Sequence, residues 1–294
     1  MSKKGITAIV LTLLGGLASS AVRSQTLSYV GSTDISTQFS PAFYEASGLG
    51  LAKNQTSLWS ISDGNLEIYK LTLSGGYDDS FVPTPINVQS TITSHDFEGV
   101  TYAPPPPGNT DDHFIYVANE ATQAILPVNY NTEKYYAEKP LSGMTGYSSV
   151  SCTGGGTVSS AFSGSASNSG LEGITWDGTY FFVIKEKDPG LIIKISADLT
   201  QILGCKVLSL PDAIDYSDIS YDPTRGKFWI ASDEAQRVYL YDWSTNSASK
   251  EWHFTSSSMA NMEGISFNPS NSRLYIATDN GYGSDSYLYV YNVQ

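Results

Sequence analysis

The segment Glu172-Gly173-Ile174-Thr175-Trp176 decides the fold, because it joins a small or acidic pair to a short β-forming run and recurs along the chain. The other copies are Ser47-Gly48-Leu49-Gly50-Leu51, Glu98-Gly99-Val100-Thr101-Tyr102, Ser217-Asp218-Ile219-Ser220-Tyr221 and Glu263-Gly264-Ile265-Ser266-Phe267. The second residues of the five pairs are 51, 74, 45 and 46 residues apart. A period of this length is the sequence signature of a repeat architecture.

A second motif follows each copy, and it consists of an apolar residue, an aromatic residue and, four residues after the aromatic, an acid. Its copies begin at Leu58-Trp59, Ile115-Tyr116, Phe181-Phe182, Phe228-Trp229 and Leu274-Tyr275. Further apolar runs come next, and Gly, Pro, Asn and Asp separate them, as is typical of short strands. Four strands in about 45 residues is the pattern of a β-propeller blade.

The repeats therefore predict an all-β protein with one β-propeller domain of five four-stranded blades. A four-stranded sheet cannot bury both faces alone, so blades must stack around an axis. The fifth repeat ends at Gln294 after three strands, and we expect Thr26–Asp34 to add the fourth and close the ring. The alternative is a sixth blade within the 74-residue interval. Residues 146–169 of that interval are rich in Ser and Gly, which favours a flexible insertion.

The first 24 residues have the layout of a secretory signal peptide: Lys3 and Lys4, an apolar run, then small residues. The apolar run is short for a membrane span of about 20 residues, although an uncleaved anchor is the alternative. We expect residues 25–294 to be secreted or periplasmic, without a membrane span after cleavage. Export permits a disulfide between Cys152 and Cys205, and two free thiols fit the sequence equally well.

The charge of the chain limits its partners. Among 294 residues, 29 are acidic and 16 are Lys or Arg, which gives a net charge of -13. An acidic protein has no electrostatic footprint for nucleic acid or anionic membranes, so we expect neither as a partner. Three His and two distant Cys cannot form a Cys-rich zinc site. We expect a monomer whose ligand is a small molecule or a cell-surface group.

Acids recur at the same place in every repeat, four residues after the aromatic of the second motif. They are Asp63, Glu120, Glu186, Asp233 and Asp279. Equivalent positions of successive blades lie on a circle, so these acids should form a ring at one end of the channel. Such a ring needs a bound cation or raised pKa values to relieve its repulsion. The alternative is that the aspartates begin turns, which Glu does poorly.

Three further acids, Glu98, Glu172 and Glu263, each precede a Gly at the start of a first strand. A Gly there permits close backbone approach where the channel is crowded. Adjacent antiparallel strands bring the end of strand two beside the start of strand one, so both sets of acids should converge. The alternative is that these glutamates accept bonds from backbone amides and tie blades together. Dense carboxylates favour a hard cation, and Ca²⁺ suits an exported protein.

The motifs, taken in order, resemble those of the SdiA-regulated family of β-propellers and of the related phytase-like and esterase-like propellers. The matching segments are Glu45–Leu49, Asp96–Val100, Asn168–Ile174, Lys185–Pro189, Asp215–Asp222 and Ser232–Glu234. The resemblance spans about Ala42 to Asn292 and implies an exported propeller with calcium near the axis. This chain differs from the phytases because its sequence has no clear cluster of Lys, Arg and His residues that could bind phosphate.

Two functions follow from this resemblance and from the acids. One is a calcium-dependent hydrolase of an ester or phosphoester, in which the metal polarises the scissile group and activates water. The other is a non-catalytic module that binds a ligand or protein and uses the cation structurally. The sequence identifies no catalytic nucleophile. The lack of a clear cluster of basic residues favours the second function.

Overall fold

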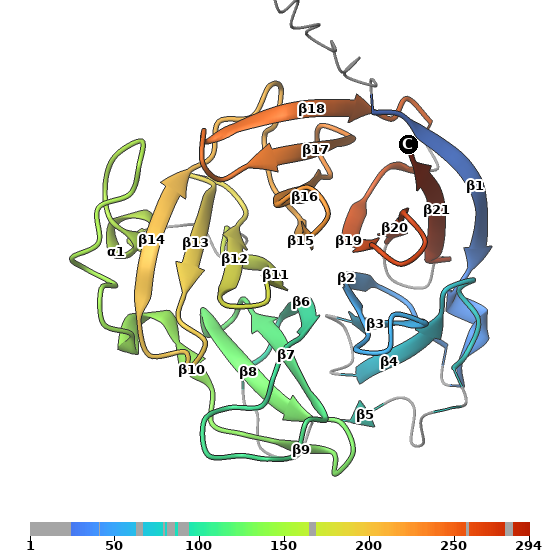
Figure 1. The fold of residues 1–294 in the computed structure, drawn as a ribbon, viewed down its shortest axis with the longest axis horizontal. Helices are drawn as coiled ribbons and strands as arrows, with labels where there is room; N and C mark the ends of the chain where they lie inside the picture. The colour runs from blue at the N-terminus through green and yellow to red at the C-terminus, as the bar shows by residue number, and fades with distance from the viewer. Residues whose placement is uncertain are drawn as a thin grey trace, which may run out of the picture.

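The computed structural model describes residues 25–40, 42–62, 67–78, 80, 86–87, 94–164, 169–256, 259–279 and 285–294. In this part of the chain, five antiparallel sheets surround a central axis (Figure 1). The expected five-bladed, all-β propeller is therefore confirmed. The expected signal peptide, residues 1–24, lies outside the described residues. Within them, no helix is long and apolar enough to cross a membrane.

The innermost strands of the blades are the first-motif segments of the sequence, and they line the axis (Figure 1). They are β2 (Ala46–Leu51), β6 (Phe97–Tyr102), β11 (Leu171–Trp176), β15 (Asp218–Asp222) and β19 (Met262–Asn268). The second strands are β3 (Ser57–Ser62), β7 (Phe114–Asn119), β12 (Phe181–Lys185), β16 (Lys227–Ser232) and β20 (Arg273–Thr278).

The third and fourth strands form the outer half of each blade. The third strands are β4 (Glu67–Thr72), β8 (Ala124–Asn129), β13 (Leu191–Ile195), β17 (Arg237–Asp242) and β21 (Tyr287–Val293). The outermost strands are β5 (Ile86–Asn87), the pair β9 (Lys134–Tyr135) and β10 (Lys139–Pro140), β14 (Ile202–Val207), β18 (Ser247–His253) and β1 (Leu27–Asp34). Buried aromatic residues pack between blades, as Tyr116 of β7 does against Phe181 of β12 at 4.6 Å between ring centroids.

The N-terminal strand closes the ring as expected. β1 pairs antiparallel with β21, from Leu27 opposite Val293 to Asp34 opposite Tyr287. Beyond the strand, Thr26 and Gln294 exchange two backbone hydrogen bonds of 3.1 Å. The two ends of the described chain therefore lie side by side in blade five, and no sixth blade is needed to complete the ring.

Glycine recurs at the start of the inner strands because these strands approach one another closely. A Cβ on Gly99 would lie 2.5 Å from the backbone oxygen of Glu172, and one on Gly48 would lie 2.6 Å from that of Glu98. Real Cβ atoms do not tolerate such distances from a backbone that is fixed by its own sheet. Four of the five blades therefore keep Gly where their inner strand contacts that of the next blade.

The Ser/Gly-rich insertion is folded where it is described, although we expected it to be flexible. A disulfide joins Cys152 to Cys205 of β14, which decides between the two alternatives for these cysteines. Thr153 pairs with Lys206 in a parallel bridge, and the short helix α1 (Val158–Phe162) buries Val158. Because these contacts are long-range, the local composition of the insertion could not reveal them.

Candidate metal centre at the acidic end of the channel

Carboxylates line a cavity of about 320 Å³ at one end of the channel. We call it the acidic cavity, and its residues are Ser47, Asp96, Glu98, Glu120, Glu172, Glu186, Glu263 and Asp279. Six of the eight acids singled out in the sequence thus lie around one space. These six acids come from blades two, three and five. Equivalent repeat positions lie at the same end of the channel, so acids of different blades meet there.

The three first-strand glutamates occupy irregular positions in their sheets. In β6, Phe97 faces Asn119 and Gly99 faces Ala118, so Glu98 is the extra residue of a β-bulge. Glu263 occupies the same bulge position in β19, and the register of β11 shifts around Glu172. A bulge of this kind bends a strand and re-aims a side chain. It explains how each Glu reaches the channel from a strand whose neighbouring residues pack into the core.

The second set of acids follows the second strands immediately. Glu120 comes directly after β7, Glu186 after β12 and Asp279 after β20. Because the second strand runs back beside the first, its end lies next to the bulge of the first strand. The two sets of acids therefore meet in the acidic cavity.

Three of these side chains are close enough to share one cation. Glu120, Glu172 and Glu186 each offer a carboxylate oxygen, and these oxygens lie within 4.8 Å of one another. Oxygens bound to one Ca²⁺ at about 2.4 Å are separated by at most about 4.8 Å. Asp96, Glu98 and Glu120 form a second such group, which shares Glu120 with the first.

Burial and mutual repulsion favour the protonated forms of these acids. Burial raises the pKa of Glu172 well above its usual range, and the neighbouring carboxylates, Glu98 first among them, raise it further. Burial also raises the pKa of Glu120 to about 7, although the Gly170 N–H donates to its Oε1 at 2.7 Å. The cavity therefore takes up either protons or a cation.

One carboxylate oxygen in the cavity has no hydrogen-bond partner. It is Oε2 of Glu186, a buried atom that meets no donor within the described part of the chain. The other oxygen of Glu186 forms an ion pair of 2.6 Å with Lys187. A buried, unpartnered carboxylate oxygen is costly unless a ligand satisfies it. The ligand atoms that Glu120, Glu172 and Glu186 offer are all carboxylate oxygens, and Oε2 of Glu186 is unsatisfied. Such a set fits a hard divalent cation.

The nearby lysines already have partners. The Lys185 ammonium donates to the backbone oxygen of Lys187, and burial lowers its pKa. Lys187 pairs with both Glu186 and Glu234, the latter at 3.1 Å. These cations therefore neutralise acids of the protein itself, which leaves them poorly placed to receive a phosphate.

One of the predicted ring acids, Asp233, does not line the acidic cavity. Its carboxylate accepts the backbone N–H of Met262 at 3.1 Å. It thus fixes the start of β19, which is a structural role. The alternative stated for the aspartates was also structural, although it placed them at the start of turns. Asp63 lies outside the described residues.

Two acids that the repeat argument did not select have clear roles. Asp96 lines the cavity. Its position two residues before Glu98 is the feature of the sequence that could have indicated this. Asp218 replaces the Gly of the repeat in blade four and is buried at the axis. Its carboxylate accepts N–H groups of Ile219 at 2.7 Å, Ile265 at 2.8 Å and Leu49 at 3.3 Å. Asp218 of blade four therefore joins neighbouring blades through backbone amides. This is the role that we considered as an alternative for the first-strand glutamates.

The comparison with protein families identifies the family of this chain. The model of the SdiA-regulated family matches residues 32–279, which is most of the chain. The chain belongs to the SdiA-regulated family. Among curated proteins, none matches this family member significantly.

Solved structures share the fold of this SdiA-regulated protein at low sequence identity. Glutaminyl cyclase from Myxococcus xanthus has a TM-score of 0.56 and 11% identity, over 92% of this chain and 97% of that one. The PQQ-bound aldose sugar dehydrogenase from Streptomyces coelicolor has a TM-score of 0.54 and 15% identity, over 92% and 99%. At these identities the similarity concerns the propeller fold alone.

Proposed function

We propose that this SdiA-regulated propeller is an exported calcium-binding protein whose acidic cavity holds the cation. The observation that carries the proposal is the set of three carboxylate oxygens, from Glu120, Glu172 and Glu186, within 4.8 Å of one another. The unpartnered Oε2 of Glu186 supports it, since a cation would satisfy that atom. The Cys152–Cys205 disulfide supports export, because disulfides persist in oxidising compartments.

Calcium should stabilise the folded protein by mass action. Free calcium at about 100 times the dissociation constant adds about 2.7 kcal/mol to the free energy of unfolding. The test is thermal melting and isothermal titration calorimetry, in chelator and in millimolar calcium. The variants are Glu172→Gln, which removes one charge from the cavity, and Glu133→Gln, which removes one charge from an exposed turn.

We expect calcium to raise the melting temperature of the wild type and of Glu133→Gln equally. Glu172→Gln should lose most of this shift, because it removes a carboxylate oxygen that would hold the cation. A wild type that calcium leaves unchanged would reject the cation site. A full calcium shift in Glu172→Gln would remove Glu172 from it.

The volume of the acidic cavity favours a second, catalytic function. About 320 Å³ is far more than the ~30 Å³ share of one water, so a cation would leave room for the reacting group of a substrate. A bound cation would supply Lewis-acid polarisation and activated water. The surrounding acids repel an anionic phosphate, which favours a neutral carboxylic ester over a phosphoester.

An activity panel distinguishes a hydrolase from a non-catalytic cation-binding module. Uncharged p-nitrophenyl esters and p-nitrophenyl phosphate would be assayed in calcium and in chelator, with wild type and Glu172→Gln. The hydrolase requires calcium-dependent ester cleavage that falls sharply in Glu172→Gln and exceeds phosphate cleavage. Calcium binding without any cleavage would identify the module.

A further inference from the structure

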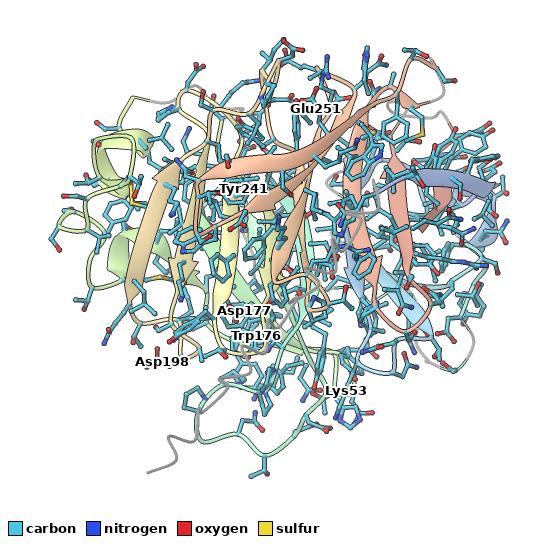
Figure 2. The ribbon with its side chains drawn as sticks, turned by 45° about the horizontal axis from the view of Figure 1, so that its top comes forward. Lys53, Trp176, Asp177, Asp198, Tyr241 and Glu251 are labelled. Carbon is cyan, nitrogen blue, oxygen red and sulfur yellow. A yellow bond between two sulfur atoms is a disulfide. The ribbon has the colours of Figure 1, made fainter. Side chains whose placement is uncertain are left out.

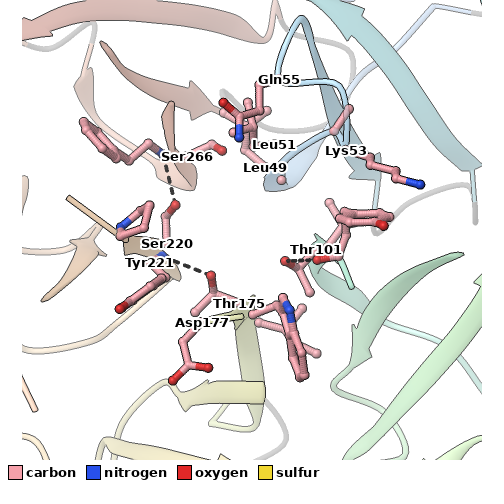
Figure 3. A pocket seen from close by; sticks show the side chains of 18 of the residues that line it. Leu49, Leu51, Lys53, Gln55, Thr101, Thr175, Asp177, Ser220, Tyr221 and Ser266 are labelled. Carbon is pink, nitrogen blue, oxygen red and sulfur yellow. Dashed lines mark hydrogen bonds between the residues drawn. The ribbon is translucent and has the colours of Figure 1, made fainter. Parts of the chain in front are cut away.

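Figure 3 shows a second cavity, of about 280 Å³. Its lining residues place it at the opposite end of the channel from the acidic cavity. The inner strands run from one cavity to the other: β11 has Glu172 in the acidic cavity and Thr175 and Trp176 in this one. Asp218 stands between them, at the level of the repeat glycines. In Figure 2, Lys53, Trp176 and Asp177 of this second cavity lie together at one end of the propeller. We call it the aromatic pocket.

The aromatic pocket is lined by two successive positions of the inner strands. One position supplies hydroxyl groups, from Thr101, Thr175, Ser220 and Ser266. The next position supplies aromatic rings, from Tyr102, Trp176, Tyr221 and Phe267. The pocket therefore combines a polar set and an aromatic set of side chains, which is the usual make-up of a small-molecule site.

Two of the hydroxyl groups have a hydrogen left to donate. Thr175 Oγ1 accepts the backbone N–H of Tyr221 at 3.0 Å, and Ser220 Oγ accepts that of Phe267 at 3.0 Å (Figure 3). A hydroxyl that accepts one bond still carries its own O–H. No other protein acceptor takes these two hydrogens among the described residues. They are available to oxygen atoms of a ligand.

The aromatic rings are held in place from behind. The Trp176 ring packs on Phe181 at 4.8 Å between centroids, and the Tyr221 ring packs on Phe228 at 5.2 Å. Both are half-buried, so part of each ring still faces the pocket or solvent. Fixed aromatic surfaces of this kind bind the apolar face of a ring at little entropic cost.

The two charged side chains that line the pocket, Lys53 and Asp177, have opposite signs. Lys53 forms an ion pair with Asp112, and Asp177 accepts the N–H groups of Thr179 and Tyr180, each at 2.7 Å. An anionic ligand would have to displace Asp112 from Lys53, and the opposite charges of Lys53 and Asp177 give the pocket no net charge that would attract an ion. The pocket therefore suits a neutral ligand.

We propose that the aromatic pocket binds a neutral pyranose sugar. A pyranose has an apolar C–H face for Trp176 or Tyr221, and oxygen atoms around its edge for the hydroxyls of Thr175 and Ser220. The volume of about 280 Å³ lies at the lower limit of ligand pockets, about 300 Å³, and so suits one small ring. This site is independent of the cation site proposed above.

The test is titration of the full protein with hexoses and N-acetylhexosamines, followed by isothermal titration calorimetry and tryptophan fluorescence. Phenol and inorganic phosphate serve as apolar and anionic comparison probes. Trp176→Phe keeps the packing on Phe181 but reduces the stacking surface. Trp243→Phe, on a loop that does not line the pocket, is the matched control.

We expect at least one sugar to bind saturably and to change the tryptophan emission. Trp176→Phe should weaken binding about tenfold, or about 1.4 kcal/mol, and Trp243→Phe should not. Methyl glycosides of the bound sugar distinguish a free sugar from the end of a glycan, which carries a substituent at C1. The proposal is overturned if no sugar binds, if phenol or phosphate binds better, or if Trp176→Phe binds the sugar as the wild type does.

Discussion

The Asp218 carboxylate accepts the backbone N–H of Leu49 at 3.3 Å, across 169 residues of sequence and from a different blade. The same oxygen accepts the N–H of Ile265 at 2.8 Å. One side chain therefore joins the inner strands of blades four, five and one at the axis. Burial raises its pKa well above the usual range, and the three amide donors oppose that rise.

Asp218→Asn should destabilise the fold, because one half of the amide is an N–H donor that would face a backbone N–H. Leaving a buried donor unsatisfied costs about 1–3 kcal/mol. Urea denaturation followed by tryptophan fluorescence measures the change. Asp198→Asn, in an exposed turn, is the control and should cost less. Equal stability of the two variants would show that Asp218 does not hold the blades.

The calcium-free protein should lose stability as the pH rises. Burial raises the pKa of Glu120 to about 7 from its ordinary value of 4.5, and the pKa of Glu172 also rises. The stabilising contribution of Glu120 is complete below about pH 4.5 and is lost as the pH rises through about 7. Melting curves in chelator from pH 5 to 8 measure this slope. Glu120→Gln should flatten it, and an unchanged slope would place the titration elsewhere.

Gly99→Ala should be strongly destabilising. Its Cβ would lie 2.5 Å from the backbone oxygen of Glu172, so two inner strands would have to separate. Overpacking of this kind costs typically about 1–3 kcal/mol. Gly31→Ala, where nothing lies within 4 Å of the new Cβ, is the control. Chemical denaturation of both variants gives the comparison, and similar losses would contradict the close contact of the inner strands.

Replacing both cysteines should destabilise the protein without changing the number of blades. The Cys152–Cys205 disulfide closes a loop with a sequence separation of 53 residues. The chain-entropy model gives about 4 kcal/mol for a loop of that length. Denaturation of the Cys152→Ser, Cys205→Ser double variant, against the wild type with and without reductant, measures the loss. A double variant as stable as the oxidised protein would contradict the prediction.

The repeat positions predicted the blades and the meeting of the acids, because rotational symmetry places equivalent residues at one height and radius. Glu98, Glu172 and Glu263 could therefore be placed near Glu120 and Glu186 before any coordinates. The bulges that aim them inward depend on pairing register, which a single sequence does not specify. Metal binding by these acids remains a prediction.

Other parts of the site depended on departures from the repeat. Asp233 occupies the same repeat position as Glu186, yet blade four has Ser217 where blades two, three and five have Glu, and Asp233 instead accepts the N–H of Met262. The pair Ser217-Asp218 is the one first-motif pair without Gly. Its role could be understood only once the structure placed Asp218 beside the inner strands of other blades. The fold of the insertion depends on long-range contacts with β14, which its Ser/Gly composition does not encode.

The pairing of β1 with β21 also determines the order of assembly. Of the described strands, β1 is synthesised first and its partner β21 last, so blade five cannot form until the other four blades have been synthesised. Ring closure therefore joins the described strands with the largest sequence separation, a slow class of contact. Until then, the hydrogen-bonding edge of β1 remains open to other partners.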